Sequence, residues 1–130
     1  MSYQPPASGA PPTHASTLRV LIVDDEALVL AAYARSFGRR VALKTAQGAS
    51  EAMDILGREP IDVVVSDYLM PGVDGMALLD MVRVLYPRVR RLLMSASFVP
   101  DLSEHLRSGL VEGFLAKPFN EADLFELLRR

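Results

Sequence analysis

The feature that most constrains the fold is a repeated alternation of short apolar runs with longer helical patterns. Near-continuous apolar runs of four to six residues occupy positions 18–23, 61–66, 91–94 and 113–116, and a weaker run lies at 41–43. Runs of this length suit strands that are buried on both faces, which is typical of a parallel sheet. The sequence therefore predicts five short strands.

Helical patterns separate these runs. Apolar residues repeat at helical spacing within 49–56, 78–85 and 124–128, and composition predicts further helices over 27–37 and 101–108. The predicted helix starts are marked by Ser50, Asp74 and Asn120. The predicted stop signals are Gly38, Gly57, Pro60, Pro87 and Gly109.

A strand followed by a helix, repeated five times, predicts an α/β fold. We expect a doubly wound, five-stranded parallel sheet with right-handed crossovers and the flavodoxin-like strand order 2-1-3-4-5. A single domain is predicted over residues 18–130. Residues 1–17 are predicted to form a disordered Pro-rich leader, because they hold four of the nine prolines and no Asp, Glu, Lys or Arg.

Composition excludes several classes of protein. The net charge is −2, from 14 basic and 16 acidic residues, which argues against direct contact with nucleic acid. The absence of cysteine excludes disulfide scaffolds, cysteine-bound zinc and thiol catalysis. The longest apolar run, 27–34, is far shorter than the roughly 20 residues of a membrane-spanning helix. We therefore expect a cytoplasmic protein.

Polar residues stand at the carboxyl ends of four predicted strands. They are Asp24 and Asp25, Asp67, Ser95 and Lys117. Ligands of such sheets bind beyond these strand ends, where the strand order reverses. Three carboxylates at one edge repel one another, and a hard divalent cation such as Mg²⁺ relieves that repulsion. The sequence predicts a magnesium site there, with Lys117 as a second positive charge.

The neighbouring residues in the sequence bear on the roles of Lys117, Asp25 and Asp67. Lysine is scarce, since Lys44 is the only other one, and Pro118 restricts the backbone beside Lys117. Asp25 has an alternative role as a helix cap. Asp67 precedes a Gly- and Pro-containing segment, 68–75, which predicts a tight loop that exposes its carboxylate.

These residues and their neighbours form four motifs, and the motifs and their order along the chain resemble the receiver domain of two-component response regulators. The resemblance covers residues 18–130 and rests on Asp24-Asp25, the Asp-x-x-Met-Pro-x-x-Asp-Gly segment that starts at Asp67, Ser95-Ala96, and Lys117-Pro118-Phe119. It implies a signalling domain rather than an enzyme, although one that assists its own phosphorylation and dephosphorylation.

The resemblance also implies roles for individual residues. Asp67 would accept a phosphoryl group from the histidine of a partner kinase. Asp24, Asp25, Asp67 and the backbone carbonyl of Leu69 would hold Mg²⁺. Lys117 and Ser95 would contact the phosphoryl oxygens, and Ser95 and Phe114 would form the conformational switch.

Two further expectations concern the neighbourhood of this site. Leu69 and Ser97 lie at the entrance that attacking water must use, and an apolar Leu69 predicts slow self-dephosphorylation. The group Arg83, Arg88, Arg90 and Arg91 is interpreted as a solvated rim.

Three alternative functions would require other residues or another outcome at this site. A Mg²⁺-dependent phosphatase or phosphotransferase with an Asp nucleophile would need a second acid where Leu69 stands. A flavin or nucleotide carrier would need a glycine-rich loop where Asp24-Asp25-Glu26 stands. A receiver-like adaptor that takes no phosphate is disfavoured by the complete set of site residues, Asp24, Asp25, Asp67, Ser95 and Lys117, and a phosphorylation assay would decide.

The expected partners follow from the receiver resemblance. They are a sensor histidine kinase or phosphotransfer protein, and an output domain or downstream protein. We expect no binding to a membrane. A homodimer that forms on phosphorylation stays an open alternative. The sequence ends at Arg130 within a predicted helix, which favours the N-terminal piece of a longer bacterial regulator over a stand-alone receiver.

Overall fold

Ten secondary-structure elements alternate along the chain in the computed structural model, which describes residues 18–130. The strands are β1 (Arg19–Val23), β2 (Ala42–Ala46), β3 (Val63–Asp67), β4 (Arg90–Ser95) and β5 (Gly113–Ala116). The helices are α1 (Ala27–Phe37), α2 (Ala49–Arg58), α3 (Gly75–Leu85), α4 (Leu102–Ser108) and α5 (Glu121–Arg129). The predicted leader, 1–17, lies outside the described residues.

All five strands are parallel and lie in the order β2-β1-β3-β4-β5, which confirms the predicted sheet. The bounds agree for β5 and differ by one to three residues for the other strands. The weak run at 41–43 overlaps a longer strand that starts at Ala42 and reaches Ala46, and the run at 61–66 starts pairing only at Val63. Asp67 and Ser95 are the last residues of β3 and β4 rather than the residues that follow them.

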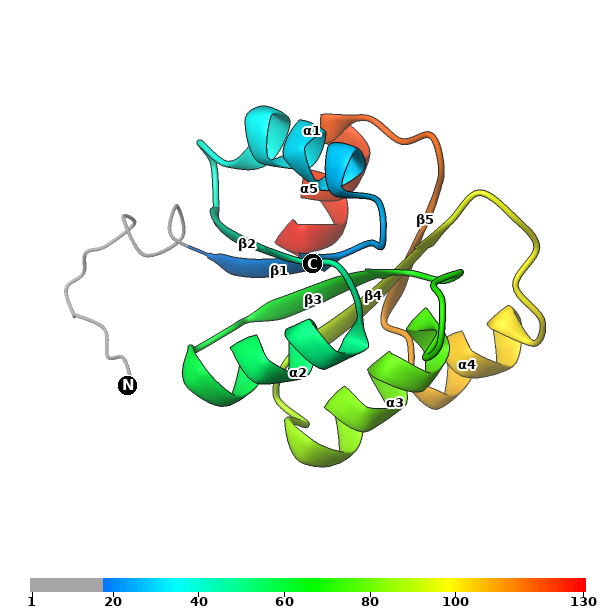
Figure 1. The fold of residues 1–130 in the computed structure, drawn as a ribbon. Helices are drawn as coiled ribbons and strands as arrows, with labels where there is room; N and C mark the ends of the chain where they lie inside the picture. Colours follow the sequence, from blue (N-terminus) through cyan, green and yellow to red (C-terminus); the bar gives the residue numbers. More distant parts are fainter. Residues whose placement is uncertain (1–17) are drawn as a thin grey trace, which may run out of the picture.

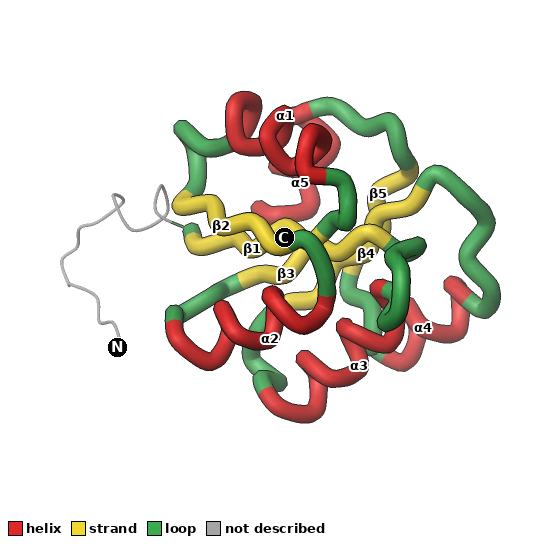
Figure 2. Tube along the Cα trace, viewed as in Figure 1, coloured by secondary structure: helices red, strands yellow, loops and turns green. Residues whose placement is uncertain are grey.

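Two helical layers cover the sheet (Figures 1 and 2). Helices α1 and α5 lie on one face, and α2, α3 and α4 lie on the other. Alternate residues of β1 divide between these layers: Val20 and Ile22 pack with α1 and α5, whereas Leu21 and Val23 pack with α2 and α3. The two apolar clusters therefore explain why the strand sequences are apolar without a break.

Helix starts agree with the sequence in two places and differ in one. The Asp74 side chain accepts a hydrogen bond from the Ala77 N–H, and Asn120 forms a reciprocal capping box with Asp123. The prediction for Ser50 was wrong, because α2 already starts after Gly48. Gly57 is not a stop either, because it lies within the last turn of α2, which ends at Arg58; the C-cap is Glu59, directly before Pro60.

The prediction of a solvated rim was wrong for Arg91. Its side chain is buried, and its guanidinium donates to the carbonyl oxygens of Leu110 at 3.0 Å, Gly109 at 3.0 Å and Val89 at 2.9 Å. These carbonyls belong to the end of α4 and the turn before β4, which the sequence does not place together. Arg91 therefore fixes the end of α4 to the sheet.

Gly75 allows α3 to start directly against the end of β3. Its N–H donates to the Tyr68 carbonyl at 2.8 Å, and a Cβ at this position would overlap the Asp67 carbonyl. The same Cβ would lie 3.0 Å from the Tyr68 Cα, also a backbone atom. Backbone atoms at that distance move only if the helix shifts, so the position requires glycine.

We therefore expect Gly75→Ala to lower the free energy of unfolding by about 1–3 kcal/mol, because the added methyl group forces α3 away from β3. Gly57→Ala is the matched control: its Cβ would meet only the Tyr86 hydroxyl, at 3.7 Å, so it should raise the free energy of unfolding by about 0.5–1 kcal/mol. Urea denaturation followed by circular dichroism measures both. Equal stability of Gly75→Ala and the wild type would contradict the steric argument.

Candidate functional site

The carboxyl ends of β1, β3, β4 and β5 meet at one cavity of about 300 Å³. The side chains that the sequence places at these strand ends all line it: Asp24, Asp25, Asp67, Ser95 and Lys117. Glu26, Leu69, Ala96 and Ser97 complete the wall. Parallel pairing of neighbouring strands is the cause, because it brings their carboxyl ends to the same edge.

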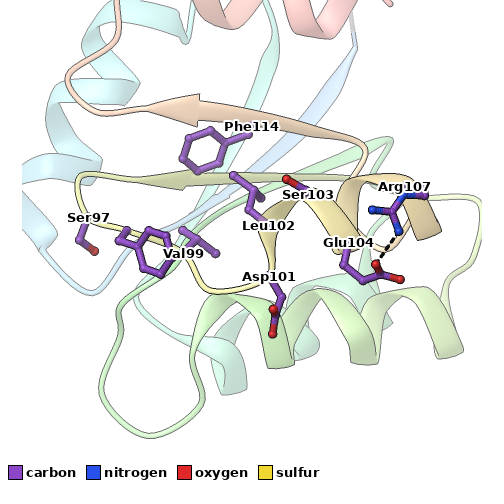
Figure 3. A pocket seen from close by; sticks show the side chains of 9 residues that line it. Ser97, Val99, Asp101, Leu102, Ser103, Glu104, Arg107 and Phe114 are labelled. Carbon is purple, nitrogen blue, oxygen red and sulfur yellow. Dashed lines mark hydrogen bonds and ion pairs between the residues drawn. The ribbon is translucent and has the colours of Figure 1, made fainter.

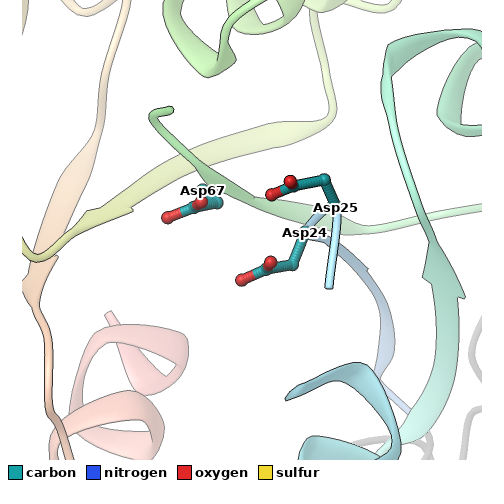
Figure 4. A group of neighbouring side chains, drawn as sticks. All are labelled: Asp24, Asp25 and Asp67. Carbon is teal, nitrogen blue, oxygen red and sulfur yellow. The ribbon is translucent and has the colours of Figure 1, made fainter. Parts of the chain in front are cut away.

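Three carboxylates lie together in this cavity (Figure 4). One oxygen from each of Asp24, Asp25 and Asp67 lies within 4.8 Å of the other two. Asp24 is fully buried, Asp25 is half-buried, and Asp67 is only 9% exposed. The prediction that a tight loop exposes Asp67 was wrong: the residue belongs to β3, where it pairs with Met94, and so lies inside the sheet edge.

Lys117 supplies the positive charge between two of these carboxylates. Its Nζ donates to Asp24 Oδ2 at 2.9 Å and lies 3.0 Å from Asp67 Oδ1. The Lys117 backbone N–H donates to the Ser95 carbonyl at 2.9 Å, which continues the pairing of β4 with β5 by one residue. The peptide bond from Lys117 to Pro118 is cis.

Burial and charge act against each other on these groups. Burial raises the pKa of Asp67 above its ordinary value, Lys117 opposes that rise, and the charges of Asp24 and Asp25 add to it. Burial alone would lower the pKa of Lys117, but its hydrogen bonds with Asp24 and Asp67 outweigh burial and raise it. Lys117 therefore stays an ammonium while the cluster keeps an excess of negative charge.

The two residues of the acidic pair differ in their contacts. Asp24 Oδ1 accepts from the Glu26 N–H at 3.0 Å while Oδ2 accepts from Lys117, so both of its oxygens have partners. The alternative that Asp25 caps the following helix does not hold, since the N-cap of α1 is Glu26 and has no side-chain capping bond. The Asp25 carboxylate is thus directed to the cluster rather than to the helix.

The Ser95 hydroxyl is at the site but engaged elsewhere. It donates to the Ser97 carbonyl at 2.9 Å and accepts from the Ser97 N–H at 3.0 Å. A turn of this kind satisfies the hydroxyl locally. The Ser95 hydroxyl can donate to a group beside Asp67 only after its hydrogen bond to the Ser97 carbonyl breaks.

Phe114 lies in a different place from the acidic residues. Its half-buried ring lines a larger cavity of about 630 Å³ between the segment after β4 and the start of α4 (Figure 3). Ser97 lines this cavity and the acidic one. The two predicted switch residues, Ser95 and Phe114, are therefore linked through the Ser97 segment rather than by a direct contact.

The sequence interpretation missed Tyr33. Burial raises the pKa of its phenol, the charge of Lys117 opposes that rise, and the charges of Asp24 and Asp67 add to it. The Tyr33 hydroxyl contacts Met94 Sδ at 3.8 Å, one residue before Ser95. Its helical spacing from Phe37 was a usable signal for a shared face of α1, but not for the proximity of that face to Lys117.

The donor set fits a hard divalent cation. Carboxylate oxygens are the ligands that Mg²⁺ takes in proteins, and here three carboxylates face a single ammonium, which leaves a negative charge that a cation would neutralise. Asp24, Asp25 and Asp67 are the residues that would hold it.

Comparison with curated proteins gives regulatory relatives. Over 83 residues, or 63% of this chain, it is 40% identical to the response regulator protein FleR of Pseudomonas aeruginosa, of which it covers 17%. Over 85% of its length it is 29% identical to the hydrogenase transcriptional regulatory protein HoxA of Cupriavidus necator, of which it covers 23%. The chain thus spans about a quarter or less of the length of these relatives.

Solved structures agree with the fold. The chemotaxis protein CheY4 of Vibrio cholerae matches 88% of this chain and 98% of its own, with a TM-score of 0.79 and 26% identity. Among the described helices, none combines the length and apolarity required to cross a membrane. The family model of the response regulator receiver domain matches residues 20–129, almost all of the described chain. The protein therefore belongs to the response regulator receiver domain family.

Proposed function

We propose that this domain accepts a phosphoryl group on Asp67 and changes conformation in response. The observation that carries the proposal is the position of Asp67, a buried carboxylate beside two others and 3.0 Å from the Lys117 ammonium. Phosphoryl transfer requires mainly positioning and neutralisation of charge, and these residues provide both.

The chemical step is a displacement at phosphorus. A carboxylate oxygen of Asp67 attacks the phosphorus of a phosphohistidine on the partner kinase or phosphotransfer protein. The P–N bond breaks, and the imidazole leaves with its electron pair and takes up a proton. Lys117 neutralises charge that develops on the phosphoryl oxygens.

Asp24, Asp25, Asp67 and the backbone carbonyl of Leu69 are the proposed protein ligands of Mg²⁺. When bound, the ion supplies positive charge to the phosphoryl oxygens. The protein contributes the fixed carboxylates, and in the absence of the ion Lys117 offsets part of the repulsion between Asp24 and Asp67.

The proposed switch begins at Ser95. A phosphoryl group on Asp67 adds acceptor oxygens, and the Ser95 hydroxyl can reach them by giving up its hydrogen bond to the Ser97 carbonyl. Because Ser97 also lines the cavity that holds Phe114, its movement changes the space open to that ring. The change at Asp67 would thereby reach the surface formed by β5 and α4.

The proposed partners follow from the regulatory relatives. We infer a sensor histidine kinase or phosphotransfer protein as the phosphoryl donor, and an output domain or downstream protein as the receiver of the signal. A cytoplasmic, bacterial setting belongs to the same proposal. The phosphatase alternative is disfavoured, because Leu69 is 59% exposed at the cavity and has no acid to offer a leaving group.

Incubation with Mg²⁺ and acetyl phosphate should add the mass of one phosphoryl group to the intact protein. Asp67→Asn should show no such gain, because an amide oxygen is a poor nucleophile. Asp54→Asn, an exposed aspartate of α2, is the matched control and should be modified like the wild type. Absence of the gain in wild type and control alike would favour the adaptor that takes no phosphate.

Lys117→Met should bind Mg²⁺ about tenfold more tightly, a change of about 1.4 kcal/mol, because no ammonium competes for Asp24 and Asp67. Its phosphorylation by acetyl phosphate should nevertheless fall about a hundredfold, since the charge on the phosphoryl oxygens is then less well neutralised. Titration calorimetry and intact mass measure the two effects. Lys44→Met, which removes the other lysine, should change neither, and an unaltered affinity in Lys117→Met would refute the competition.

Spontaneous loss of the phosphoryl group should be slow in the wild type and roughly tenfold faster in Leu69→Asn, because an amide at this position can orient the attacking water. The decay of phosphorylated protein, followed by intact mass after removal of acetyl phosphate, gives both rates. Val73→Asn places the same amide in the same loop at an exposed position that does not line the cavity, and should leave the rate unchanged. Fast loss in the wild type that Leu69→Asn does not alter would contradict the proposal.

A further inference from the structure

Lys117 depends on a short loop for its position. β5 ends at Ala116 and α5 begins at Glu121, so Lys117 is the first residue of the connection between them. The Lys117 N–H still pairs with the Ser95 carbonyl, at 2.9 Å. A long side chain with several freely rotating bonds needs a fixed backbone on both sides if its Nζ is to stay between two carboxylates.

After Lys117, the ring of Phe119 holds the backbone of the loop in place, two residues further along the chain. This ring stacks on Tyr33, with centroids 5.7 Å apart and planes at 19°, and on Phe37, with centroids 6.4 Å apart and planes at 16°. Tyr33 and Phe37 themselves stack at 5.6 Å, one turn apart on α1. The loop after Lys117 is therefore held against a nearly parallel group of three rings.

Tyr33 joins this group to the strand ends. While its ring faces Phe119, its hydroxyl contacts Met94 Sδ at 3.8 Å, and Met94 pairs in the sheet with Asp67 and Leu115. Phe37 instead makes an edge-to-face contact with Phe125, with ring centroids 6.1 Å apart. Of the two α1 rings, Tyr33 is thus the one that connects the Lys117 loop with the strands that carry the acidic cavity.

We propose that Tyr33 is a positioning residue that keeps the Lys117 ammonium between Asp24 and Asp67 by fixing the ring of Phe119. The aromatic ring carries this role through its stacking on Phe119, and the contact of the hydroxyl with Met94 serves here only to show that the ring lies beside the strand ends. The consequence for phosphoryl transfer rests on the proposed function, whereas the position of Lys117 in the unmodified protein does not.

The composition of the chain offers a direct test. It has only two lysines, so a protein labelled isotopically at lysine Cε gives two NMR signals, and the exposed Lys44 serves as an internal reference. Without Mg²⁺ or phosphate, the wild-type Lys117 signal should be displaced from that of Lys44 and broadened by its ordered environment. In Tyr33→Leu it should move toward the Lys44 signal and sharpen, whereas Tyr33→Phe, which keeps the ring, should restore the wild-type signal.

Two further variants separate positioning from a loss of stability. Leu30→Ala removes a buried side chain of α1 outside the stacked rings, so it should lower stability without moving the Lys117 signal. Phe119→Leu breaks the same contact from the loop side and should reproduce the shift of Tyr33→Leu. The double variant should show no larger shift than either single one, because both residues act through one contact.

Phosphorylation by acetyl phosphate should be about tenfold slower in Tyr33→Leu than in Leu30→Ala. A wild-type Lys117 signal in folded Tyr33→Leu or folded Phe119→Leu would overturn the positioning role. If the signal moves as expected but the wild type takes no phosphate, the proposed function fails while the position of Lys117 still depends on Tyr33. The two failures are therefore distinguishable.

Discussion

An ammonium held between two buried carboxylates is the interaction on which the site depends. Asp24 and Asp67 are withdrawn from water beside a third acid, an arrangement that without compensation would favour protonation of one of them. The Lys117 Nζ contacts both at about 3 Å, and the same contacts keep it charged. Such a pair is costly to break from one side, because the remaining charges would stay buried.

The strand order of the sheet brings these charged side chains together. β1 and β4 flank β3, and β5 lies beyond β4, so the ends of the four strands form one edge. Gly75 lets α3 begin directly after that edge, where any side chain would collide with the Asp67 backbone. Lys117 enters from β5 while the aromatic rings of α1 hold the loop that follows it. The helices on both faces of the sheet therefore hold the strands whose ends carry these side chains.

The segment between β4 and α4 has fewer contacts with the acidic cluster and with the core. The Ser95 hydroxyl is satisfied by Ser97 and not by the acidic cluster, and Ser97 also borders the cavity beside Phe114. α4 has no buried residue, whereas its C-terminal end is held by the Arg91 guanidinium. A helix anchored at one end and loosely packed along its length can move with little loss of buried apolar surface.

The amino-acid sequence is enough to predict the order of the elements, the parallel sheet and the polar residues at the strand ends. These are consequences of local periodicity: apolar runs end where the chain leaves the sheet, and parallel pairing then collects their last residues at one edge. It also determined the caps at Asp74 and Asn120, whose partners lie within one helical turn.

Which polar groups are buried, and which partners hold them, depends on contacts between distant parts of the chain. Arg91 looks like part of a charged surface until the end of α4 supplies its carbonyl partners, and Asp67 looks like a loop residue until its pairing with Met94 draws it into β3. Tyr33 acquires its relation to Lys117 only when α1 packs beside the loop after β5. The physical reason is the same in each case: the partner is distant in the sequence, so no local spacing records the contact.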